Sequence, residues 1–182
     1  MSHHADSKQD SYTDHASGVV LPKSVGSLER VSLDDDDPDK NPVTAHYAPA
    51  GSSDYLDAAI RILPATQAEP EQLISETIRS AETRPNFAQN DYRGNQSFGA
   101  SRAFCAECSF DRPESGDRAT FKIAIIPRGN YLLCFTFLVR SAQEQPTQSV
   151  VDAFIQEILA RTNKKQVYLT PSKPSDDDAG GN

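Results

Sequence analysis

Long apolar runs are missing from this sequence of 182 residues, and no stretch approaches the ~20 consecutive apolar residues that a membrane-spanning helix needs. Residues 1–17 also lack the basic start and the apolar stretch of a secretory signal peptide. These two absences argue against membrane insertion and favour a cytoplasmic protein.

Cysteine is scarce, and the chain has three of them, an odd number that fits a reducing compartment better than a disulfide framework. Cys105 and Cys108 form a CxxC motif inside a stretch that predicts a strand. Because side chains three positions apart in a strand point to opposite faces, we expect these two thiols not to meet. Cys108 and Cys134 are expected to behave as small apolar side chains.

Catalytic motifs are missing as well. The nine glycines form neither a phosphate-cradling loop nor a Gly-x-Ser-x-Gly elbow. Three of the four histidines lie in the first 15 residues, and His46 falls in a predicted strand without a second ligand at metal-binding spacing. We therefore predict no catalytic residue, no cofactor and no metal ligand, and expect that the protein is not an enzyme.

Positive charge is in deficit, since 18 Lys and Arg face 26 Asp and Glu and the net charge is −8. Such a chain repels phosphate backbones, so we expect no nucleic-acid partner. The acidic run Asp34 to Asp39 lacks the alternating ligands, the central Gly and the terminal Glu of an EF-hand loop. We interpret it as a solvated loop between two strands.

Large apolar side chains are nearly absent from both ends of the chain. Such segments cannot bury enough surface to offset the loss of backbone entropy, so residues 1–18 and the acidic residues 170–182 are expected to be disordered tails. Residues 19–169 are expected to form a single domain, which is large enough for a core without disulfides.

Within that domain, alternation of apolar and polar residues predicts strands near 28–33, in 42–49, in 55–64 and around 103–110. Two further runs flank Pro127-Arg128-Gly129-Asn130 and predict a hairpin from Phe121 to Val139. In the strand around 103–110, the expected core side is Phe104, Ala106, Cys108 and Phe110, and the expected outward side is Ala103, Cys105, Glu107 and Ser109.

Two segments change to a helical period. The first carries its apolar stripe at Leu73, Ile74, Thr77, Ile78 and Ala81. The second carries its stripe at Val150, Val151, Phe154, Ile155, Ile158 and Leu159. The element order predicts an α+β fold, an antiparallel sheet of about six or seven strands with both helices packed on one face.

The second arm of the hairpin is apolar on both sides. Tyr131, Leu133, Phe135, Phe137 and Val139 form one side, and Leu132, Cys134, Thr136 and Leu138 form the other. A sheet with one face in water would carry charged residues on that face. The second side is therefore either covered in a central strand or part of a partner-binding surface, and these four residues are our candidates for partner binding.

The order of several segments, among them "VTAHYAP", "AAIRILP", "EPEQLISETIRSAE", "GASRAFCAECSF" and "SVVDAFIQEILA", resembles that of PsbP-like and DcrB-like proteins over about residues 19–161. Members of that family are non-enzymatic modules, which include photosystem subunits, lipoproteins, a Ran-GTPase release factor and adaptor chaperones for type VI secretion effectors. The resemblance implies a binding role closest to the cytoplasmic adaptors. It transfers no site residues, because no site motif matches.

These features lead to three functional hypotheses. The first is a non-enzymatic cytoplasmic module that binds another protein, such as an adaptor or chaperone for an apolar partner segment. The second is a thiol-based or small-molecule-binding function that uses Cys105 on the solvent side of its strand. The third is a structural subunit of an envelope or secreted assembly.

Overall fold

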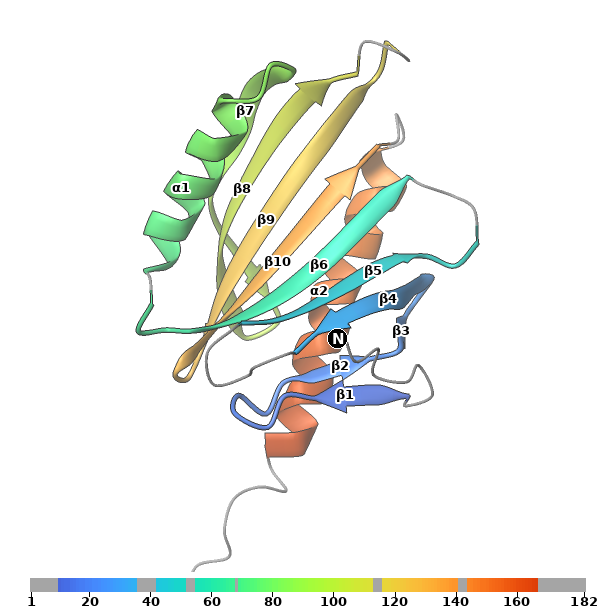
Figure 1. Cartoon of the computed structure of the whole chain (residues 1–182), viewed down its shortest axis with the longest axis vertical. Coiled ribbons are helices and arrows are strands. Elements are labelled where there is room, and N and C mark those ends of the chain that lie inside the picture. Colours follow the sequence, from blue (N-terminus) through green and yellow to red (C-terminus); the bar gives the residue numbers. More distant parts are fainter. Residues whose placement is uncertain are drawn as a thin grey trace, which may run out of the picture.

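The computed structural model describes residues 10–35, 42–51, 55–67, 69–112, 116–140 and 144–166. In these ranges the chain forms an antiparallel sheet of eight strands in the order β3-β4-β5-β6-β10-β9-β8-β7, and a separate sheet of two strands, β1 and β2 (Figure 1). The α+β fold class predicted from the sequence is confirmed. The strands are β1 Ser11–Thr13, β2 Val20–Pro22, β3 Ser24–Val25, β4 Leu28–Asp34, β5 Val43–Pro49, β6 Leu56–Pro64, β7 Phe87–Phe98, β8 Ser101–Asp111, β9 Arg118–Arg128 and β10 Tyr131–Val139.

The two helices, α1 (Pro70–Glu82) and α2 (Glu144–Gln166), lie on opposite faces of the large sheet. Figure 1 shows α1 in front of the strands and α2 behind them. We call the side of α1 the front face and the side of α2 the back face. The prediction that both helices share one face is wrong, because β10 has apolar residues on both sides and each side needs a cover.

The central position of β10 explains its composition. It lies between β6 and β9, and its register with both strands is regular along its whole length. Leu133, Phe135 and Phe137 point to the back face and join the core under α2. Leu132 and Cys134 point to the front face and join a second core cluster with α1. The predicted hairpin from Phe121 to Val139 is confirmed, with Gly129 at a φ of 57° in its turn.

Strand β7 was not predicted from the sequence, and together with the short β3 it raises the strand count above the predicted six or seven. It contains twelve residues, most of them polar and exposed, and lies at one edge of the sheet. The register with β8 shifts between Phe87 and Gln89 and again between Asn90 and Tyr92. An edge strand needs no second apolar face and is often bulged, so its sequence reads as a polar connection.

Regular structure begins closer to the N-terminus than predicted. Residues 10–18 belong to the predicted tail, yet β1 pairs with β2 and Asp14 is only 3% exposed. The Asp14 carboxylate accepts hydrogen bonds from the backbone N–H (2.8 Å) and the hydroxyl of Ser17, which closes a tight turn. Tyr12 packs against the back-face core. Residues 1–9 and 170–182 lie outside the described residues.

The back-face core is organised around Phe154 of α2. This side chain is 1% exposed, and its ring packs edge-to-face against Tyr47, Phe137 and Phe135 at centroid distances of 5.0, 5.7 and 6.4 Å. The buried Tyr47 hydroxyl donates a hydrogen bond to the Pro22 carbonyl oxygen (2.9 Å) and so ties β5 to β2. The apolar stripe predicted for α2 is therefore confirmed.

Replacing Phe154 by Ala removes three aromatic contacts from a closed site. We expect the free energy of unfolding to fall by about 3–5 kcal/mol. Val31→Ala is the control, because Val31 is 64% exposed and its truncation should change stability by about 0.5 kcal/mol or less. Urea unfolding of both variants measures the difference, and equal stabilities would contradict this description of the core.

Candidate functional site

The front face is covered only in part. Helix α1 packs against β7, β8 and β9. Figure 1 shows β10, β6 and β5 continuing beside it with no described helix in front of them. On the back face, α2 contacts elements as far apart as β7, β10 and β3, so it crosses most of the sheet. The open part of the front face is therefore the side of the fold that can receive a partner.

Local sequence signals place α1. Pro70 occupies the first turn, where its missing N–H costs nothing, and Glu71 follows it near the positive helix end. Ile74, Ile78 and Ala81 are buried against the sheet, as the predicted stripe requires. The helix therefore docks by one flank and leaves the flank that faces β10 and β6 partly exposed.

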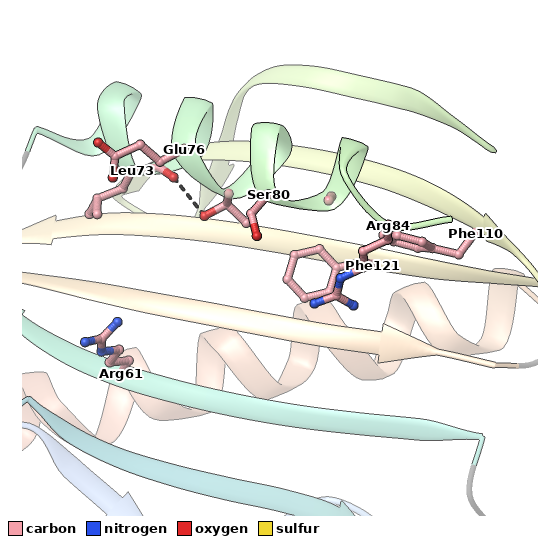
Figure 2. Close-up of a pocket in the computed structure, with 9 residues that line it drawn as sticks. Arg61, Leu73, Glu76, Ser80, Arg84, Phe110 and Phe121 are labelled. Atoms are coloured by element: carbon pink, nitrogen blue, oxygen red, sulfur yellow. Dashed lines mark hydrogen bonds between the residues drawn. The ribbon is translucent and has the colours of Figure 1, made fainter. Parts of the chain in front are cut away.

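A groove of about 330 Å³ lies along that flank. Its apolar lining comes from Phe110, Phe121, Leu73 and Ala81, and its polar lining from Thr77, Ser80, Glu76, Arg61 and Arg84. Figure 2 shows the Ser80 hydroxyl directed toward the groove and the Phe121 ring standing on the sheet below α1. Phe121 and Leu73 are half-buried, so part of their apolar surface is available for contact.

The three charged residues that line the groove have different neighbours. The Arg84 guanidinium carbon lies 5.6 Å from the centroid of the Phe110 ring, a cation–π contact that orients it. Arg61 projects from β6, where its direct cross-strand neighbours, Cys134 and Thr44, are neutral. Glu76 accepts a hydrogen bond from the Gln72 side chain (2.9 Å) and lines the groove, at the end of α1 where Figure 2 shows Leu73.

The four residues predicted to bind a partner divide into two pairs. Leu132 is 2% exposed and Cys134 is 7% exposed, and both belong to the front-face core. The structure therefore places them in the core, where a partner cannot reach them. Thr136 and Leu138 are half-buried and lie on the uncovered part of the front face, so their role in binding stays a prediction. Leu138 lies directly across from Asp57 of β6.

A matched pair of substitutions separates these two environments. Leu132→Lys places a charge in the core and should lower the free energy of unfolding by about 3–5 kcal/mol. Leu138→Lys places the same charge opposite Asp57 at a half-exposed position and should cost about 1 kcal/mol or less. Urea unfolding followed by circular dichroism measures both, and equal losses would contradict the proposed boundary between core and surface.

The thiol hypothesis expected Cys105 on a solvent-exposed face, and this expectation is wrong. Cys105 is 5% exposed and faces the back-face core, while Cys108 belongs to the front-face cluster. The prediction that the two thiols point to opposite faces is confirmed. The prediction that the other side of β8 points to solvent is wrong, because α2 covers the back face and buries Ala103 and Cys105 there.

Burial also changes the acidity of the thiols. Desolvation raises the pKa of Cys105 and of Cys134 to about 11, and it raises the pKa of Cys108 as well. The thiolate is the reactive form, so the raised pKa values lower the reactivity of all three thiols near neutral pH.

We expect iodoacetamide at pH 8 to label none of the three cysteines in the folded protein at a substantial rate. With a pKa of about 11, only about one in a thousand of the Cys105 and Cys134 thiols is ionised at pH 8, the pKa of Cys108 is also raised, and burial limits access to all three. All three should label quickly in 8 M urea. Mass spectrometry of labelled peptides measures this, and rapid labelling of Cys105 in buffer would restore the thiol hypothesis.

A polar cluster lies between the back face and α2. Lys122 of β9 bonds to Glu107 of β8 (3.0 Å) and to Gln148 of α2 (2.8 Å), next to a cavity of about 30 Å³. A cavity of that size holds about one water molecule. These contacts attach α2 to the sheet, and the cavity is too small for a ligand.

Neither a metal site nor a membrane-spanning helix is found in the described ranges. They contain no group of three or more His, Cys, Asp or Glu side chains that could hold a metal ion. Neither α1 nor α2, as far as the structure describes them, is long and apolar enough to cross a membrane. His46 is exposed on the front face of β5.

Sequence reasoning did not identify the groove. Its residues come from β6, from α1 and the turn after it, and from β8 and β9, which are separated along the chain and meet only in the folded protein. Arg61 offered a weak signal, because it interrupts an otherwise apolar stretch of β6. Nothing in the sequence indicated that Arg84 and Phe121 would lie along the same groove.

Comparison with known proteins gives structural likenesses only. No protein-family model matches the chain, and no curated protein matches it. Among solved structures, PA94 of Pseudomonas aeruginosa, a protein of unknown function, is 16% identical with a TM-score of 0.49, covering 72% of this chain and 95% of its own. The Ran-binding protein Mog1p of Saccharomyces cerevisiae is 10% identical with a TM-score of 0.44, covering 85% and 92%.

LpqN of Mycobacterium tuberculosis, which is involved in cell envelope biogenesis, is 16% identical with a TM-score of 0.43, covering 85% of this chain and 84% of its own. All three TM-scores are below 0.5, so these likenesses carry no argument about function. The resemblance to PsbP-like and DcrB-like proteins stays a prediction.

Proposed function

We propose that the protein is a non-enzymatic binding module that holds a segment of another polypeptide in the groove between α1 and the open front face. The observation that carries this proposal is the incomplete cover of that face. Helix α1 covers β7, β8 and β9 and leaves a groove with exposed apolar surface at its edge.

The dimensions of the groove favour a short segment over a globular surface. About 330 Å³ is at the lower end of ligand-binding cavities and accommodates a few side chains. Leu73 and Phe121 offer half-buried apolar surface, and each Å² that a partner covers contributes about 25 cal/mol at most. Contact over so small an area supports reversible binding, as expected of an adaptor or chaperone.

The other two hypotheses have less support. The thiol hypothesis loses its premise, because Cys105 is buried and its pKa is raised to about 11. The cytoplasmic location stays a prediction from the cysteine count. The role of a structural subunit in an envelope or secreted assembly is an untested alternative, and the identity of the binding partner would decide between the two.

Blocking the groove tests the proposed function. Ser80 is exposed on the flank of α1 that lines the groove, so Ser80→Trp should fill the space and reduce partner binding at least tenfold. The protein is purified from its source organism with an affinity tag, the co-purifying chain is identified, and its affinity for purified wild type and variant is measured by calorimetry.

Arg79→Trp is the matched control. Arg79 is exposed on the same helix but does not line the groove, so the added ring should leave the affinity unchanged. Circular dichroism verifies that both variants fold. Equal affinities of Ser80→Trp and wild type for the identified chain would overturn the proposal.

A further inference from the structure

We infer that the segment held in the groove is acidic, with carboxylates that pair with Arg61 and Arg84 on either side of an apolar contact. This inference rests on the proposed function and specifies the chemistry of the partner. The distribution of charge around the groove supports it.

Cations with a carboxylate partner are common on this molecule. Arg118 pairs with Asp111 at 3.3 Å and Lys122 with Glu107 at 3.0 Å, and two further pairs join Arg140 to Asp57 and Arg161 to Glu157. This is expected in a chain in which 26 acidic residues outnumber 18 basic ones.

The groove differs from this pattern. Among the described residues, no carboxylate forms an ion pair with Arg61 or with Arg84. Glu76 is the acidic residue of the groove lining, and its carboxylate already accepts a hydrogen bond from Gln72. The groove lining therefore carries a net positive charge on a protein whose net charge is −8. That contrast attracts acidic ligands selectively and repels basic ones.

The environment of Arg84 suits a carboxylate. Its guanidinium carbon lies 5.6 Å from the centroid of the Phe110 ring, and no hydrogen bond or ion pair within the described residues uses its N–H groups. Those N–H groups form the fork that binds a carboxylate through two parallel hydrogen bonds. Arg84 is exposed, so a carboxylate can reach these N–H groups from solvent.

The spacing along the groove sets the length of the segment. Figure 2 shows Arg61 toward the Leu73 end and Arg84 at the end where Phe110 and Phe121 lie. Helix α1 rises about 14 Å between Leu73 and its last residue, Glu82, and Arg84 lies two residues beyond that end. An extended chain covers that distance with about five residues. The inferred ligand is a segment of about five residues with acidic side chains near both ends and an apolar side chain between them.

Selection from a random peptide library tests this inference without knowledge of the natural partner. A phage library of random 12-residue peptides is selected against immobilised wild-type protein, with the Ser80→Trp variant as the counter-selection target. We expect enriched peptides in which Asp or Glu flank an apolar or aromatic residue. A fluorescein-labelled copy of one enriched peptide should bind at least tenfold more weakly to the Arg61→Gln, Arg84→Gln double variant, and more weakly in 0.5 M salt.

Arg79→Gln is the matched control, because Arg79 is exposed on α1 and does not line the groove. This variant should bind the labelled peptide as wild type does. Enrichment of neutral apolar peptides whose binding ignores both arginines would overturn the inference and leave the proposed function standing. Failure to enrich any peptide that distinguishes wild type from Ser80→Trp would overturn both.

Discussion

The two apolar sides of β10 constrain the rest of the structure. A strand with Leu133, Phe135 and Phe137 on one side and Leu132 and Cys134 on the other cannot leave either side in water without a large loss of stability. The sheet must therefore be covered twice. Helix α2 covers the back face, and α1 with the side chains beside it covers the front face around the same strand.

The two covers are unequal, and this difference produces the candidate site. Helix α2 has 23 residues and contacts strands from β7 to β3, whereas α1 has 13 residues and contacts β7, β8 and β9. The front-face strands beyond α1 are less apolar, with Ala59 and Arg61 on β6 and Thr44 and His46 on β5. The groove lies at the boundary between the covered and the open halves, where apolar and charged side chains come together.

The distribution of the cysteines follows from the same layering. A CxxC in a strand sends its sulfurs to opposite faces, and here both faces are covered, so Cys105 and Cys108 are both buried. The period of the strand determines that the two thiols point in opposite directions. It does not determine that either direction leads to solvent, because that depends on where α2 packs.

Local patterns were sufficient for β5, β6, α1, α2 and the hairpin of β9 and β10, since each carries its own apolar period and turn residues. They were insufficient for β7, whose edge position removes the apolar signal, and for β1, which Asp14 and Ser17 stabilise through a local turn.

The sequence by itself determined the secondary structure of most segments, the α+β class and the presence of two apolar faces on β10. Only the tertiary structure decided which face each helix covers and how far the cover extends. It also decided that Arg61, Arg84 and Phe121 line one groove. Periodicity reports how a segment divides its own side chains between two sides, whereas the element that packs against each side depends on pairings between residues far apart in the chain.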